Sequence, residues 1–176
     1  MTAPHAPHLV TLAIVLTTLL TWPLAASAQE RPRPMAEIAA GALLFADDGV
    51  VREGFLGGTV RLYVLPRVSI GPEIAYIVGQ NHSHLMVTGN VTFDFVRPIG
   101  REPRRVTPFA VVGGGLFQTR EQFPNNETFT SADGAFTAGV GVRTLIGDRV
   151  IVGAEARVGW ELHVRLNGMV GVRLSK

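Results

Sequence analysis

Residues 148–176 read DRVIVGAEARVGWELHVRLNGMVGVRLSK and contain two long alternations of apolar and polar positions, over 150–160 and 164–174. Every second residue in each run is apolar, and many of the residues between are glycine or charged, as Glu155 and Arg157 are. Because successive side chains of a strand point to opposite faces, this period of two predicts β-strands. Both runs exceed the usual strand of about 5–6 residues and reach the roughly 9–11 residues that a tilted strand needs to cross a bilayer.

The same alternation recurs along the rest of the chain, and it predicts six further strands over residues 36–46, 56–64, 68–78, 85–95, 106–119 and 132–142. In 106–119 both faces carry apolar residues, so the direction of that strand's faces stays open. Polar, open connections are expected at 47–54, 80–84 and 120–130, while the connections after the second and sixth strands are short. Alternating long and short connections are typical of transmembrane β-barrels. The prediction is an all-β, eight-stranded, antiparallel up-and-down transmembrane barrel.

The N-terminus has the pattern of a secretory signal peptide. Residues 9–25 are apolar and are followed by Ala26-Ser27-Ala28, a small-residue cleavage site, which predicts a signal peptide over 1–28. The alternative is an uncleaved membrane anchor, and Pro23 and the absence of flanking cations argue against it. Export through this signal would deliver the chain to the bacterial envelope.

Removal of 28 of the 176 residues leaves 148, which is enough for one domain. We expect a flexible lead-in at 29–35 and a barrel domain at 36–176. The chain has no cysteine, so it has no disulfide and no thiolate metal site. Its 16 basic and 14 acidic residues give a net charge of +2 without a clustered basic stripe, which argues against a nucleic-acid partner. No cofactor is predicted.

Period two alone does not say which face of the barrel is inside, because a soluble barrel buries its apolar face and a membrane barrel turns it outward. The apolar face is almost uninterrupted, and the other face mixes charged with small residues, so we expect the charged face inside. Paired there, these residues would close the interior and leave no open pore: Arg61, Glu73, Asp94, Arg143, Glu155, Arg157, Arg165 and Arg173. Candidate membrane-interface aromatics are Tyr76, Phe93, Phe95 and Trp160. The alternative is a soluble periplasmic ligand-binding barrel with the faces reversed.

Four residues bear on catalysis or metal binding, namely His82, Ser83, His84 and His163. A serine beside histidines is compatible with a nucleophilic, lipid-modifying barrel enzyme of the lipid A deacylase type. A His-x-His pair is also compatible with a metal site. Ordinary loop histidines are commoner than either, so we predict neither a catalytic nor a metal site, and the enzyme stays the alternative.

Segments such as Gly139-Val140-Gly141-Val142-Arg143 and Gly168-Met169-Val170-Gly171-Val172-Arg173-Leu174, together with the strand count, give the chain a wider likeness. It resembles the small eight-stranded bacterial outer-membrane β-barrel superfamily, in plan like outer-membrane protein X and the N-terminal barrel of outer-membrane protein A. The resemblance implies an outer-membrane location, contact with outer-membrane lipid and lipopolysaccharide, and insertion by the barrel assembly machinery. It also implies a structural or interactive role, with an extracellular ligand met by the loops at 47–54, 80–84 and 120–130.

Overall fold

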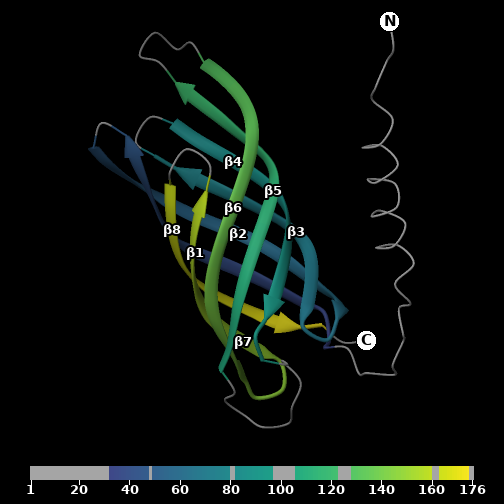
Figure 1. The fold of residues 1–176 in the computed structure, drawn as a ribbon. Helices are drawn as coiled ribbons and strands as arrows, with labels where there is room; N and C mark the ends of the chain where they lie inside the picture. The colour runs from purple at the N-terminus through teal and green to yellow at the C-terminus, as the bar shows by residue number, and fades with distance from the viewer. Residues whose placement is uncertain are drawn as a thin grey trace, which may run out of the picture.

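The computed structural model describes residues 32–47, 49–79, 82–96, 106–122, 128–159 and 163–174. These residues form a closed barrel in which every strand pairs antiparallel with its sequence neighbours (Figure 1). The strands are β1 (Met35–Asp47), β2 (Gly49–Leu65), β3 (Val68–Val78), β4 (His82–Asp94), β5 (Val106–Gln122), β6 (Thr128–Ile146), β7 (Val150–Gly159) and β8 (His163–Arg173). The predicted eight-stranded all-β barrel is confirmed. The predicted signal peptide at 1–28 lies outside the described residues.

β1 and β8 close the barrel. They pair antiparallel along their length, with Ile38 opposite Val170. Just beyond both strands, the backbone N–H of Leu174 donates to the carbonyl oxygen of Pro34 at 2.8 Å. Closure leaves no free edge along the central part of the strands. Beyond it, β6 continues past its pairing with β7, which begins at Thr137, and β2 begins before its pairing with β3, which starts at Gly54. Over the described ranges, no helix has the length and apolar character needed to span a membrane.

Three connections predicted as open loops are partly strand, and those predicted boundaries are wrong. β2 begins at Gly49, β4 at His82 and β6 at Thr128, so strand pairing covers most of 47–54, half of 80–84 and both ends of 120–130. Antiparallel pairing depends on backbone groups and continues where the side chains are polar on both faces. The hairpin of β5 and β6 therefore extends beyond the other strands (Figure 1).

The barrel is apolar outside and largely polar inside. Outward-facing, exposed side chains occur on every strand and include Ile38, Leu56, Ile74, Val87, Val112, Val140, Val158 and Val170. This arrangement is the reverse of the soluble ligand-binding barrel considered above, which would need its apolar face inside. In β5 the structure fixes the open choice of faces, since Phe109, Val111 and Phe117 point inward and are buried. The interior thus also holds apolar clusters, around Phe55 and Phe117 on one side and around Phe109 and Met169 on the other.

Candidate functional site

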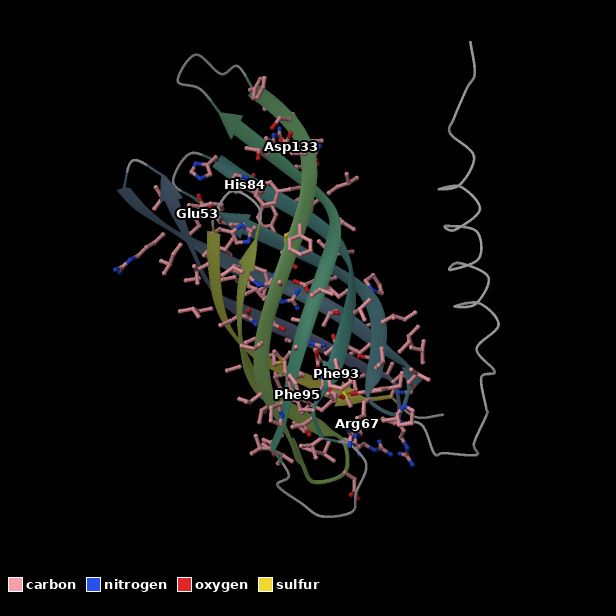
Figure 2. All side chains as sticks on the ribbon, in the orientation of Figure 1. Glu53, Arg67, His84, Phe93, Phe95 and Asp133 are labelled. Carbon is pink, nitrogen blue, oxygen red and sulfur yellow. The ribbon has the colours of Figure 1, made fainter. Side chains whose placement is uncertain are left out.

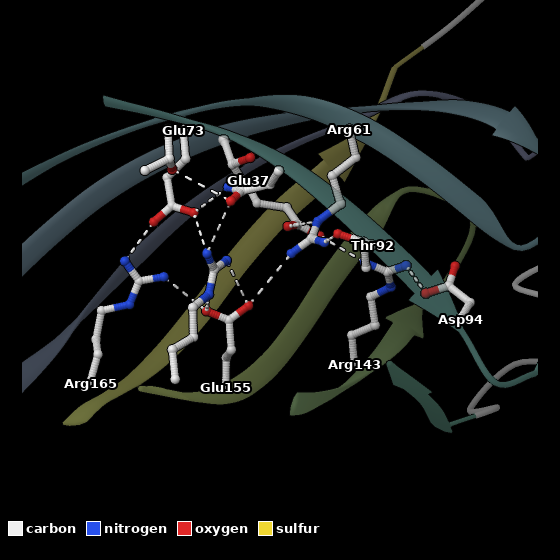
Figure 3. Close-up of polar contacts among 12 residues, drawn as sticks. Glu37, Arg61, Glu73, Thr92, Asp94, Arg143, Glu155 and Arg165 are labelled. Atoms are coloured by element: carbon white, nitrogen blue, oxygen red, sulfur yellow. Dashed lines mark hydrogen bonds and ion pairs between the residues drawn. The ribbon is translucent and has the colours of Figure 1, made fainter. Parts of the chain in front are cut away.

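The centre of the barrel holds a network of buried charges, which we call the interior ion network. It consists of four arginines and four carboxylates, none more than 5 % exposed: Arg61, Arg143, Arg157, Arg165, Glu37, Glu73, Asp94 and Glu155. Seven of the eight strands contribute to it, all except β5 (Figure 3). The four positive and four negative charges balance, which offsets the high cost of burying each ion.

One half of the network joins β3, β7 and β8. Arg157 forms a bidentate pair with Glu155, through Nε at 2.5 Å and Nη2 at 3.0 Å, and its Nη1 lies 2.9 Å from Glu73. Arg165 reaches the same two carboxylates, at 2.6 Å from Glu73 and 3.0 Å from Glu155. Asn90 donates to Glu73 at 2.7 Å. Each carboxylate is therefore shared by two guanidinium groups, a geometry that suits the planar fork of arginine.

The other half joins β1, β2, β4 and β6. Arg61 donates through Nε to Glu37 at 2.6 Å, and Arg143 pairs with Asp94. The hydroxyl of Tyr63 donates to Asp94 at 2.8 Å and accepts from Arg143 Nη2 at 2.7 Å. The two halves meet where Arg61 Nη2 lies 3.8 Å from Glu155 (Figure 3). Asp94 is fully buried, and its two oxygens are engaged by Arg143 and by the hydroxyl of Tyr63.

Aromatic rings cover the faces of the guanidinium groups. The ring of Phe109 lies under Arg61 and Arg143, at 5.0 and 4.9 Å from ring centroid to Cζ, and Phe55 lies 4.3 Å from Arg165. Such cation–π contacts gain strength when water is excluded. β5 thereby supports the network through Phe109 although it supplies no charge to it.

Glycines make room for these long side chains on the neighbouring strand. Gly139 lies opposite Arg157 and Gly171 opposite Glu37 in the strand pairing. A Cβ at Gly139 would lie 2.5 Å from Cγ of Arg157, and one at Gly171 would lie 2.7 Å from Cγ of Glu37, both too close for real atoms. What remains between the network side chains is a space of about 10 Å³ for a water-sized sphere, room for about one water molecule.

Seven of the eight charged residues predicted to face the interior lie in this network, and the eighth does not. Arg173 is half-buried at the last position of β8, at the end of the barrel where β1 begins. Sequence reasoning missed Glu37, which lies on the inward parity of β1. Its neighbours on that parity, Ala39 and Gly41, are small and gave that face no polar character. Tyr63 was missed because an aromatic residue in a strand is read as apolar.

A second group of polar residues lies inside the barrel at the end opposite the start of β1 and the end of β8. We call it the mouth cluster, and it consists of Glu53 of β2 with His82 and His84 of β4. Figure 2 shows Glu53 and His84 near that end, far from Phe93 and Phe95. One oxygen of Glu53 contacts Nε2 of His82, and the other lies 3.5 Å from Nε2 of His84. The three side chains are 1 %, 29 % and 10 % exposed for Glu53, His82 and His84.

The residues weighed for catalysis are not brought together as a nucleophile and a base. Ser83 pairs with the outward-facing Val78, so its hydroxyl lies on the opposite face from the imidazoles before and after it. His163 faces the interior from β8, where the ring of Phe45 lies 5.5 Å from it and 5.9 Å from His84. Ser83 is therefore not placed to act as a nucleophile activated by His82 or His84, as the lipid-modifying alternative would need.

Three of the aromatics expected at a membrane interface are exposed on the outer face. Phe93 and Phe95 form an edge-to-face pair, 5.5 Å between ring centroids. They lie near the end of the barrel where β1 begins and β8 ends (Figure 2). Tyr76 lies near the opposite end of β3. Trp160 lies outside the described residues.

No protein-family model matches the sequence, and no curated protein matches it. Solved structures do match in fold. Neisserial surface protein A has a TM-score of 0.68 at 11% identity, covering 80% of this chain and 97% of that one. The N-terminal β-barrel domain of Pseudomonas aeruginosa OprF has a TM-score of 0.56 at 13% identity, covering 80% and 97%.

Ail, the attachment invasion locus protein of Yersinia pestis, has a TM-score of 0.56 at 10% identity, covering 82% of this chain and 99% of Ail, and it has also been solved in complex with the heparin analogue sucrose octasulfate. At such low identity the likeness concerns the fold alone. It agrees with the closed ring of eight antiparallel strands and with the apolar outer face described above. The chain has the fold of the small eight-stranded bacterial outer-membrane β-barrels.

Proposed function

We propose that this protein is exported to the bacterial outer membrane and serves there as a barrel with a structural or surface-interaction role, its interior closed by the interior ion network. The observation that carries the proposal is the polarity of the barrel. Large apolar side chains are exposed around the whole circumference, while the charges at the middle of the strands are buried inside. Exposed charges, such as Arg52, Arg67 and Arg149, lie toward the ends of the strands. Only contact with lipid makes this arrangement stable, because water would penalise such a wide apolar surface.

The backbone supports the same proposal. A bilayer offers no water to unpaired N–H and C=O groups, so a spanning sheet has to close on itself. The pairing of β1 with β8 achieves this. Each strand has at least 10 residues, which is enough to cross the hydrocarbon core at a tilt. Outer-membrane lipid and lipopolysaccharide are the partners of this outer face, and insertion would depend on the barrel assembly machinery.

The closed interior follows from packing. The packing of the interior ion network supports this proposal, since the space that its side chains border has room for about one water molecule. Contact with the environment would therefore take place at the end of the barrel where the β5–β6 hairpin extends furthest, opposite the start of β1 and the end of β8 (Figure 1). An extracellular ligand would be met there and not inside a pore.

Fractionation of the source bacterium tests the location. We expect the protein in the outer-membrane fraction, and we expect its mobility on SDS gels to change on boiling, because a closed barrel resists SDS until it is heated. Recovery of the protein from the soluble periplasm without such a mobility change would refute the membrane proposal. The closed interior is tested separately in planar bilayers, where the purified protein should give no steady ion conductance.

A further inference from the structure

We propose that the mouth cluster of Glu53, His82 and His84 is a binding site for a divalent transition-metal ion such as Zn²⁺. The cluster takes no part in the interior ion network, and the proposal does not depend on where the protein resides. One ligand atom from each residue lies within 4.8 Å of the other two. Two imidazole nitrogens and a carboxylate oxygen form a donor set that Zn²⁺ and its neighbours in the first transition row prefer.

The charge of Glu53 gives the first argument. Its side chain is 1 % exposed, and among the described residues its ion pairs are with His82 and His84 and with no arginine. The other buried carboxylates of the barrel each face an arginine, which is always charged. A buried carboxylate needs a positive partner. A metal ion held between Glu53 and the two neutral imidazoles supplies it.

The orientation of the donors gives the second argument. Both Nε2 atoms are turned toward the same carboxylate, one to each oxygen. Nδ1 of His84 lies 3.0 Å from the hydroxyl of Thr119, and the His84 ring stacks on Phe117 at 4.8 Å between centroids. When Nδ1–H of His84 donates to the Thr119 hydroxyl, Nε2 carries no proton and can be the ligand, as in protein sites where a second group orients each histidine.

The space around the cluster gives the third argument. Ligands of a tetrahedral zinc ion are about 3.4 Å apart. The three ligand atoms lie within 4.8 Å of one another, so small side-chain rotations would bring the most distant pair closer and would open the Glu53–His82 contact, which is shorter than this spacing. Gly79 borders the cluster, and a Cβ there would lie 2.8 Å from Glu53 and would also overlap His82. His82 is the most exposed of the three and opens the site to the end of the barrel, which provides a route for the ion. With three protein ligands, one position stays open for water or an external ligand.

Calorimetric titration with ZnCl₂ tests the proposal on the full chain, extracted from membranes into detergent and carrying no polyhistidine tag. His5 and His8 lie in the predicted signal peptide and leave with it, so only the three barrel histidines remain of the five in the sequence. We expect one Zn²⁺ per chain. Glu53→Gln and the double variant His82→Asn/His84→Asn should each weaken binding by more than about 100-fold, and Thr119→Val by about 10-fold, as for loss of an orienting group.

His163→Asn is the matched control, because His163 also faces the interior but lies across Phe45 from the cluster. It should bind Zn²⁺ like the parent chain. The mobility change on boiling confirms that each variant is folded, and visible absorption of bound Co²⁺ reports nitrogen and oxygen ligation independently. The proposal is overturned if the parent chain binds no Zn²⁺ in stoichiometric amount, if Glu53→Gln binds as tightly as the parent, or if His163→Asn loses as much affinity as the cluster variants.

Discussion

Asp94 shows why individual residues of the interior ion network cannot be removed singly. Its side chain is fully buried, and its two oxygens are taken by Arg143 and by the hydroxyl of Tyr63. Among the described residues, loss of the Asp94 charge leaves Glu37, at 3.8 Å, as the remaining carboxylate partner of Arg143. A buried ion without a close partner is costly, whereas loss of both members of a pair removes both desolvation penalties together.

Asp94→Asn is therefore expected to lower the free energy of unfolding by about 3–5 kcal/mol. In the double variant Asp94→Asn/Arg143→Met the loss should be smaller than the sum of the two single losses, because neither unpaired ion remains. Urea unfolding in detergent micelles measures all three variants. Strictly additive losses would show that Asp94 and Arg143 do not stabilise each other.

Gly139 makes a prediction about space. A Cβ there would meet Cγ and Cα of Arg157, at 2.5 and 2.9 Å, so Gly139→Ala has to displace a network side chain or the strand that carries it. We expect a loss of about 1–3 kcal/mol in the free energy of unfolding. Gly134→Ala, on the same strand with nothing within 4 Å of the added methyl group, is the control and should be neutral or slightly stabilising. Equal effects of both substitutions in the same urea titration would contradict this account.

At the scale of strands, the sequence predicts the central segments well because one face must be apolar and the other must not. β7 and β8 illustrate this, since their alternation specifies both the strands and the face that turns inward. The inward face of β5 could not be predicted in this way, because its apolar residues Phe109 and Val111 also point inward, where they pack against guanidinium groups and other apolar side chains. The strand ends at Gly49 and Thr128 were not predicted because the alternation is too short or irregular there, as in Val50-Val51-Arg52-Glu53, and backbone pairing carries the strand on.

The same reasoning limits how much of the two polar groups could be predicted. The alternation predicts which arginines and carboxylates face inward, but it does not predict which of them pair, because partners lie on strands far apart in the sequence, as Arg165 and Glu73 do. The mouth cluster depends on the barrel in the same way. Glu53 was predicted to lie in a loop and is brought to His82 and His84 by the extension of β2.

β6 offers a test of where its outer face contacts lipid. Val140 lies on the outer face beside the interior ion network. Ala132 lies eight residues earlier on the same face of β6, in the part of that strand that extends past its pairing with β7, which begins at Thr137. Val140→Arg should make folding into lipid vesicles less favourable by about 2–4 kcal/mol, the cost of arginine at the bilayer midplane. Ala132→Arg should cost at most about 1 kcal/mol, as near an interface. Similar costs at both positions, measured by urea titration in vesicles, would place both at the same depth and contradict this account: inside the hydrocarbon core if both are high, outside it if both are low.

At the scale of the whole molecule, the interior ion network links nearly all strands at one level of the barrel. Glu155 and Arg157 of β7 lie at its centre, and around them remain three one-to-one pairs: Arg61 with Glu37, Arg143 with Asp94, and Arg165 with Glu73. This arrangement separates two properties that the network confers, charge balance and the filling of space. Removing the central pair alters the second and leaves the first intact.

The double variant Glu155→Ala/Arg157→Ala should therefore remain folded and give ion conductance in planar bilayers, where the parent chain gives none. Both long side chains border the 10 Å³ space at the network, so their truncation widens that space. Glu155→Gln/Arg157→Met keeps most of the side-chain volume while it removes the same two charges, and it should stay closed. The mobility change on boiling checks that both variants are folded barrels. If the volume-keeping variant conducts as well as the alanine variant, it is the charge of the central pair and not its bulk that closes the barrel. If neither conducts, the remaining three pairs suffice to block the interior.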